Sequence, residues 1–311
     1  MKTSYKVTIF IFSFLALNFL CKSLTDDFSS YYLLPPAPSG SEWTTNQAPQ
    51  NLDEILSQKY TYLDNAKGKQ SYVFVSEDKM HVLKLFKPLS PFLAFSLFGK
   101  TFHIGLAKIP FVKALSIKPS SDSYLRTRDL EFQSYINSFF LLPEETKLEY
   151  IHLATTNHLQ KKLKIYDKIG VLHTIDLDSS SFLIQKKTDL LYPTLSRLLK
   201  NKETQKAKLL LKNFVEFYFY LIEKDIVNPT TLEKKLGCFD LKTIQIDVGR
   251  VLRPQDLQLA DFKVPLTQIY QSTAHMKKWL KSRSPELYIY LKQIEEDLIQ
   301  EKSGSLPKEL N

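Results

Sequence analysis

The sequence predicts a mixed α+β protein with two lobes, on two observations. Between about residues 59 and 186, short β-rich runs alternate with polar turns, and one long helical pattern is embedded among them. Beyond residue 190, helical patterns dominate and one short hairpin is indicated. We therefore expect a β-rich N-terminal lobe over residues 52–190, a reduced helical C-terminal lobe over 191–302 and a flexible polar tail over 303–311.

The first 23 residues are typical of an export or anchoring segment. Lys2 and Lys6 precede an uncharged, mostly apolar run over residues 7–20. A basic start followed by a short apolar run is the pattern of a secretory signal peptide. We expect residues 1–23 to be a signal peptide or an uncleaved anchor, and the rest to be exported, whether secreted, periplasmic or anchored facing outward. Lipidation of Cys21 remains a further alternative.

A linker is predicted next, because residues 24–51 are rich in Ser, Pro, Asn and Thr and include Pro35-Pro36-Ala37-Pro38. The rest of the composition, with 43% hydrophobic and 13% aromatic residues, is typical of an ordered globular chain. A net charge of +9 is compatible with an anionic partner or surface. We see no nucleic-acid-binding motif, no disulfide framework and no histidine spacing that suits a metal.

The N-terminal lobe should begin with an antiparallel meander. Residues 60–63, 71–75 and 81–87 are β-rich, and short polar turns separate them. An insertion follows over residues 88–122, in which Phe and Pro are frequent; it either packs over the core or touches a membrane or a partner. The later elements that we predict are a helix over 123–142, strands within 148–153, 163–171, 173–177 and 182–185, helices over 192–224, a hairpin over 238–246 and a closing helix over 285–301.

Three of these pieces occur in an informative order. A strand–turn–strand with Gly68 in the turn precedes the strand that ends in Lys84, and the helix containing Glu131 follows. Much later, Asp247-Val248-Gly249 follows a long helix, a loop and an apolar strand. This order resembles the protein-kinase fold, and more closely a divergent group of kinase-like bacterial proteins, over roughly residues 59–255.

The resemblance implies a nucleotide site. In a kinase, a lysine on the third strand pairs with the nucleotide phosphates and with a glutamate of the following helix, and these positions match Lys84 and Glu131. The metal-binding Asp-Phe-Gly motif is matched by Asp247-Val248-Gly249, so Asp247 would hold Mg²⁺ beside ATP. The backbone from Gln185 to Lys187 would face the adenine, and Gly68 would belong to the loop that covers the phosphates.

The departures from the kinase pattern bear on activity. The phosphate-covering loop keeps Gly68 alone of three expected glycines. Asn228 stands where the catalytic aspartate belongs, and Asp225, three residues earlier, is the nearest substitute base. The chain also has no Ala-Pro-Glu motif after Gly249. An exported domain would, in addition, meet little ATP.

These features leave three functions open. The leading prediction is an exported, degenerate pseudokinase that acts as a binding or regulatory module toward a protein partner or an anionic surface. One alternative is an atypical active kinase, an ATP-dependent phosphotransferase acting on a protein, sugar or lipid. Another is a membrane-associated structural protein that uses residues 88–122 and the N-terminal segment to reach the membrane.

Overall fold

The structure of the 311-residue chain is a computed structural model. The chain divides into two compact units, and each is described by itself. Unit 1 comprises residues 1–128 and 149–187, and unit 2 comprises residues 129–148 and 188–311. The structure describes residues 2–31, 33–45, 47–64, 70–87, 92–97, 100–105, 121–226, 236–249, 251–257 and 268–305.

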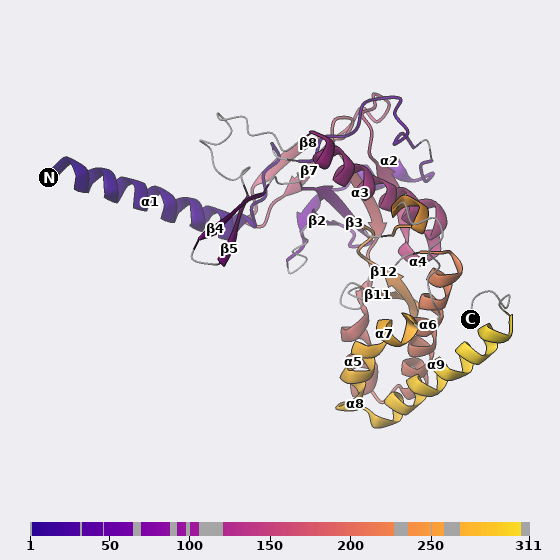
Figure 1. Cartoon of the computed structure of the whole chain (residues 1–311). Helices are drawn as coiled ribbons and strands as arrows, with labels where there is room; N and C mark the ends of the chain where they lie inside the picture. Colours follow the sequence, from indigo (N-terminus) through magenta and orange to yellow (C-terminus); the bar gives the residue numbers. More distant parts are fainter. Residues whose placement is uncertain are drawn as a thin grey trace. The chain divides into compact units, whose positions relative to one another are not determined.

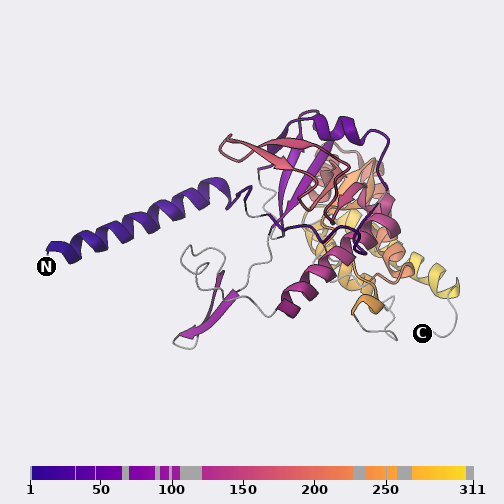
Figure 2. The same ribbon diagram turned by 90° about the horizontal axis from the view of Figure 1, so that it is seen from above.

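A seven-stranded sheet forms the centre of unit 1 (Figure 1 and Figure 2). Its strand order is β6-β9-β3-β2-β1-β7-β8, with antiparallel β1–β2–β3 and a parallel contact between β1 and β7. The order along the chain therefore differs from the order across the sheet. The strands are β1 (Tyr60–Tyr62), β2 (Ser71–Ser76), β3 (His81–Phe86), β6 (Leu148–His152), β7 (Lys162–Tyr166), β8 (Leu172–Asp176) and β9 (Phe182–Lys186).

The core of unit 1 forms because these strands are rich in aromatic and branched residues, which pack well on a pleated surface. All six residues of β3 are buried, and Phe74 of β2 and Phe182 of β9 are fully buried in the same cluster. The other elements in this part of the chain are α1 (Lys2–Thr25), α2 (Leu52–Ser57) and the hairpin of β4 (Phe92–Leu97) with β5 (Lys100–Gly105).

The segment predicted to be a linker belongs to the core of unit 1. Phe28 packs edge-on against Tyr72 and Phe74, with ring centroids 4.9 and 5.3 Å away. The side chains of Leu34 and Trp43 are buried as well. The polar composition of residues 24–51 therefore hides a few apolar residues, spaced too irregularly to give a periodic signal, that attach this segment to the sheet.

Unit 2 is mainly helical. Its helix α6 (Thr204–Glu223) buries Leu210, Leu211, Phe214 and Tyr218, a spacing that places apolar side chains on one face. Its other elements are α4 (Pro143–Thr146), α5 (Leu191–Lys200), η4 (Pro254–Leu257), α7 (Gln268–Ser272), α8 (Ala274–Lys281), α9 (Pro285–Ser305) and the small sheet of β10 (Asp189–Leu190), β11 (Leu236–Phe239) and β12 (Lys242–Gln245).

The prediction of a mixed α+β fold is confirmed. The division of the chain differs from the predicted contiguous lobes, because residues 129–148 belong to unit 2 and not to the β-rich unit. Helix α3 (Ser121–Leu141) begins in unit 1 and contributes its second part to unit 2. Much of the 88–122 insertion, Gly68, Asn228 and the end of the predicted tail lie outside the described residues.

The charged residues of helix α1 lie toward its two ends, at Lys2, Lys6 and Lys22, and the uncharged run between them is mostly apolar. In the described part of the chain, no helix has the length and apolar character needed to cross a membrane. Both cysteines are free thiols; Cys21 is exposed on α1 and Cys238 is buried on β11.

Candidate functional site

Lys84 is a buried lysine in the middle of unit 1. Only 7% of it is exposed, and its Nζ donates a hydrogen bond of 2.7 Å to Oε1 of Gln185. Gln185 pairs with Val82 across the β3–β9 ladder, so Lys84 and Gln185 are diagonal neighbours on one face of the sheet. A buried ammonium needs such partners, because leaving it without hydrogen bonds would be costly. Two residues predicted to serve a nucleotide therefore contact each other directly.

Glu131 and Asp247 form the second pair of predicted site residues, and both belong to unit 2. They influence the same buried side chain, Tyr135 of α3. Burial raises the pKa of Tyr135 well above its ordinary value, and the negative charges of Glu131 and Asp247 raise it further. The two carboxylates thus act on one phenol, that of Tyr135, which lies one helical turn after Glu131.

The segment Asp247-Val248-Gly249 is fixed to helix α3 by hydroxyl groups. Ser134 and Ser138 both donate to the carbonyl oxygen of Val248, at 2.6 and 3.2 Å. Ser134 also accepts the N–H of Val251 at 2.6 Å. These positions recur at i and i+4, so they lie on one face of the helix.

Asn137 of the same helix fixes the residues that follow this segment. Its Nδ2 donates to the carbonyl oxygen of Val251 at 3.0 Å and to Oδ2 of Asp256 at 2.7 Å. Asp256 Oδ2 in turn accepts the N–H of Arg253 at 2.7 Å. Side chains of one face of α3 therefore hydrogen-bond to the chain from Val248 to Asp256.

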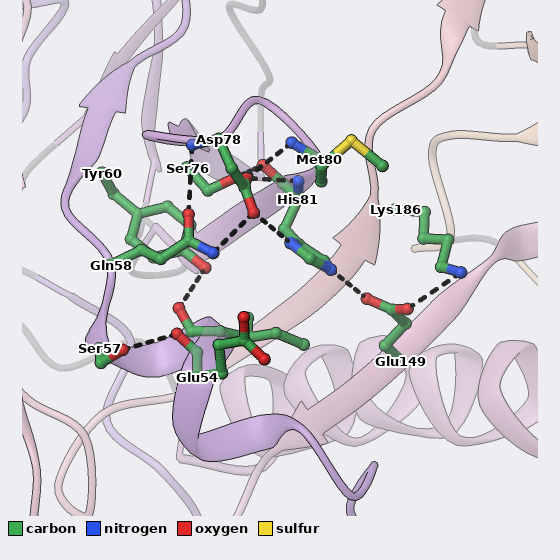
Figure 3. A network of polar contacts seen from close by, with 11 residues as sticks. Glu54, Ser57, Gln58, Tyr60, Ser76, Asp78, Met80, His81, Glu149 and Lys186 are labelled. Atoms are coloured by element: carbon green, nitrogen blue, oxygen red, sulfur yellow. Dashed lines mark hydrogen bonds and ion pairs between the residues drawn. The ribbon is translucent and has the colours of Figure 1, made fainter.

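A network of charged side chains in unit 1 was not predicted from the sequence. Figure 3 shows His81 between two carboxylates, with Nε2 3.0 Å from Oε2 of Glu149 and Nδ1 3.8 Å from Oδ2 of Asp78. Lys186 approaches the other oxygen of Glu149 at 3.5 Å. The sequence signal that could have revealed part of it is the turn Ser76–Met80, in which Asp78 bonds its own neighbours.

This network touches the segment predicted to face an adenine. The N–H of Lys187 donates to the carbonyl oxygen of Met80 at 2.8 Å. His81 and Lys186 pair across the ladder between β3 and β9. The backbone donor at Lys187 is therefore already used inside the protein.

The remaining predicted site residues make no described contact with the others. Asp225 follows the end of α6, is exposed and has a left-handed backbone with φ of 52°. Asn228 and Gly68 are outside the described residues. In the described part of the chain, no three His, Cys, Asp or Glu side chains come together to hold a metal.

A shallow cavity of about 280 Å³ lies elsewhere in unit 1. Residues 30, 31 and 33–35 form one side of it, and residues of β8 and the following turn form the other. None of the predicted site residues lines this cavity, so it adds nothing to the nucleotide hypothesis.

In comparisons with known proteins, no family model and no curated protein matches the chain.

Proposed function

We propose that this chain is an exported kinase-like domain that works as a binding or regulatory module, with phosphotransfer lost or heavily altered. The observation that carries the proposal is the attachment of the Asp247–Gly249 segment to helix α3, the helix that carries Glu131. A kinase site needs its metal-binding aspartate and this glutamate to be positioned by neighbouring elements. The order of β1, β2 and β3, with Lys84 on the third strand, supports the same proposal.

Three features favour a module over an enzyme. The ammonium of Lys84 is buried and donates a hydrogen bond to Gln185, the residue predicted to begin the adenine-facing segment. The N–H of Lys187 is bonded to Met80. Asn228 stands at the position of the catalytic base, and an amide cannot accept a proton as a carboxylate does.

An atypical active kinase is the second candidate. The observation in its favour is the shared influence of Glu131 and Asp247 on Tyr135, which keeps two acidic groups of the kinase pattern in one region of unit 2. ATP and Mg²⁺ would be its cofactors, and Asp225 its base. Its substrate would be a protein, sugar or lipid.

Thermal unfolding of the full chain separates the two candidates. The variants are Lys84→Ala and Asp247→Ala, with the exposed Lys164→Ala and Asp297→Ala as matched controls. A ligand at a hundred times its Kd stabilises a protein by about 2.7 kcal/mol. For a chain of this size, this corresponds to a rise of about 5–10 °C.

We expect millimolar ATP with Mg²⁺ to give no rise of that size and no transfer of labelled phosphate. The module proposal would be abandoned if a metal-dependent rise occurred in the wild type and the controls, disappeared in both site variants and came with phosphate transfer. That result would establish the active kinase.

We propose export because of the N-terminal segment, whose apolar side chains are exposed along α1. A membrane-associated structural role stays the third candidate, because such a helix needs apolar surroundings. We propose a protein or an anionic surface as the partner, and no nucleic acid.

A further inference from the structure

The turn between β7 and β8 is held in one conformation by a buried aspartate. Oδ1 of Asp167 accepts the N–H of Ile169 at 3.1 Å and the N–H of Val171 at 2.8 Å. The backbone N–H of Asp167 donates to the carbonyl oxygen of Val171 at 3.0 Å. Gly170 supplies the left-handed conformation at the tip, with φ of 82°. The turn is therefore preorganised by backbone contacts.

This fixed turn presents three apolar side chains to solvent. Ile169 is 53% exposed, and Val171 and Leu172 are each 48% exposed. Turns are normally polar, and the carboxylate of Asp167 holds this one by accepting two backbone N–H groups and by contacting His173. The apolar side chains are thus unnecessary for the shape of the turn, and an exposed group of them marks a contact surface. We call Ile169, Val171 and Leu172 the hairpin patch.

The hairpin patch is tied to the end of helix α1. Lys168 Nζ lies 3.2 Å from Oδ2 of Asp26, the residue that follows α1. His173, which contacts Asp167, packs edge-on against Phe28 with 5.0 Å between ring centroids. The chain just after α1 and the turn that carries the patch are therefore in direct contact, through Asp26 with Lys168 and Phe28 with His173.

Helix α1 is itself apolar on all sides. Consecutive residues on a helix point in directions about 100° apart, so the run from Ile9 to Phe12 covers its whole circumference. The exposed fractions along this helix range from 47% to 77% at Ile9, Phe10, Ile11, Phe12, Phe14, Leu15, Leu17, Phe19, Leu20 and Leu24.

We infer that α1 and the hairpin patch contact the same lipid surface. The inference rests on the third candidate function, in which α1 stays on the chain as a membrane anchor. Lys162 and Lys164 lie on the exposed face of β7, the strand that leads into the turn. Lysines near an apolar contact are attracted to anionic lipid headgroups, so the surface should be anionic. The hairpin patch would fix the orientation of unit 1 at the bilayer.

Fluorescent labels in the full chain test this inference. In a Cys21→Ser, Cys238→Ser background, one cysteine each is introduced as Phe12→Cys, Val171→Cys or Met80→Cys and labelled with an environment-sensitive dye. Met80 is the matched control because it is 58% exposed on another hairpin turn, between β2 and β3. The chains are reconstituted in vesicles of phosphatidylethanolamine and phosphatidylglycerol, and quenching by aqueous iodide is measured.

The expected result is a blue shift and loss of iodide quenching at positions 12 and 171, with position 80 still quenched. Neutral phosphatidylcholine vesicles should protect position 171 less. Protection at 12 with full quenching at 171 would overturn the inference and leave α1 as the anchor. Protection at all three positions, or crosslinking between copies through position 171, would also overturn it. Iodide quenching at position 12 would show that α1 does not enter the bilayer, so the membrane-anchor candidate itself would be rejected.

Discussion

Two segments of this molecule are held in place by opposite means. The turn between β7 and β8 in unit 1 is held by Asp167, which bonds residues two and four positions further along the chain. The segment around Val248 in unit 2 is held by Ser134, which lies 114 residues away in the sequence. One is local and uses a carboxylate, and the other is long-range and uses a neutral hydroxyl. Loss of a local contact should open only its own turn. Loss of a long-range contact should lower the free energy of unfolding of the whole unit.

The largest expected effect comes from Ser134→Ala. This change leaves the buried N–H of Val251 without its acceptor and removes one donor from the Val248 carbonyl. Unsatisfied buried groups cost about 1–3 kcal/mol each, so we expect a loss of about 2–3 kcal/mol in the free energy of unfolding. Urea unfolding measures it.

Ser196→Ala is the control, because that hydroxyl is exposed on α5 and bonds its own helix. It should cost less than about 0.5 kcal/mol. Equal costs for the two variants would show that the contact at Val248 contributes nothing to stability.

An intermediate effect is expected from Asp167→Ala. Hydrogen bonds to charged groups contribute about 1.5–3 kcal/mol, but here the loss should open the turn and leave the sheet intact. We expect amide exchange at Ile169 and Val171 to become about tenfold faster or more, measured by hydrogen exchange with NMR detection. Asp167→Asn keeps an acceptor oxygen and should restore most of the protection. Faster exchange at Phe74 in the core of unit 1 would contradict a local role.

The smallest effect concerns pH. Burial raises the pKa of Asp78, but hydrogen bonds from Ser76, Met80 and Gln58 and the nearby His81 outweigh burial and lower it below its usual value. A carboxylate with a lowered folded pKa contributes stability above its unfolded pKa of about 3.9 and loses it as the pH falls through the folded value.

The decline in unfolding midpoint below about pH 4 should therefore be shallower in Asp78→Asn than in the wild type. Ser134→Ala should keep the wild-type slope, because a hydroxyl does not titrate in this range. Parallel curves for the wild type and Asp78→Asn would show that the turn is insensitive to this charge. Denaturant midpoints from pH 7 to pH 2.5 provide the measurement.

The sequence predicted the elements whose signals are local. The β-rich runs at residues 60–63, 71–75 and 81–87 correspond to β1, β2 and β3, because alternating apolar residues and polar turns are read within a few positions. It also singled out Lys84 as a candidate on β3. It did not reveal that Gln185, 101 residues later, would bond that lysine. The pairing depends on strand register, which a sequence pattern of period two leaves open.

The burial of Phe28 and Leu34 shows the same limit. Their surroundings are rich in Pro, Ser and Asn, so local composition indicated a linker. Phe28 is buried against Tyr72 and Phe74 on a distant strand, and the N–H of Leu34 bonds the carbonyl oxygen of Phe86.

By itself, the sequence determined the α+β class, the positions of most helices and strands and the apolar character of the N-terminal segment, since these follow from hydrophobic periodicity and turn chemistry. Only the tertiary structure decided which polar groups meet. It placed Ser134 on Val248, His81 on Glu149 and Lys168 on Asp26. Such contacts join residues far apart in the chain, and they form because each buried polar group needs a partner in the folded state.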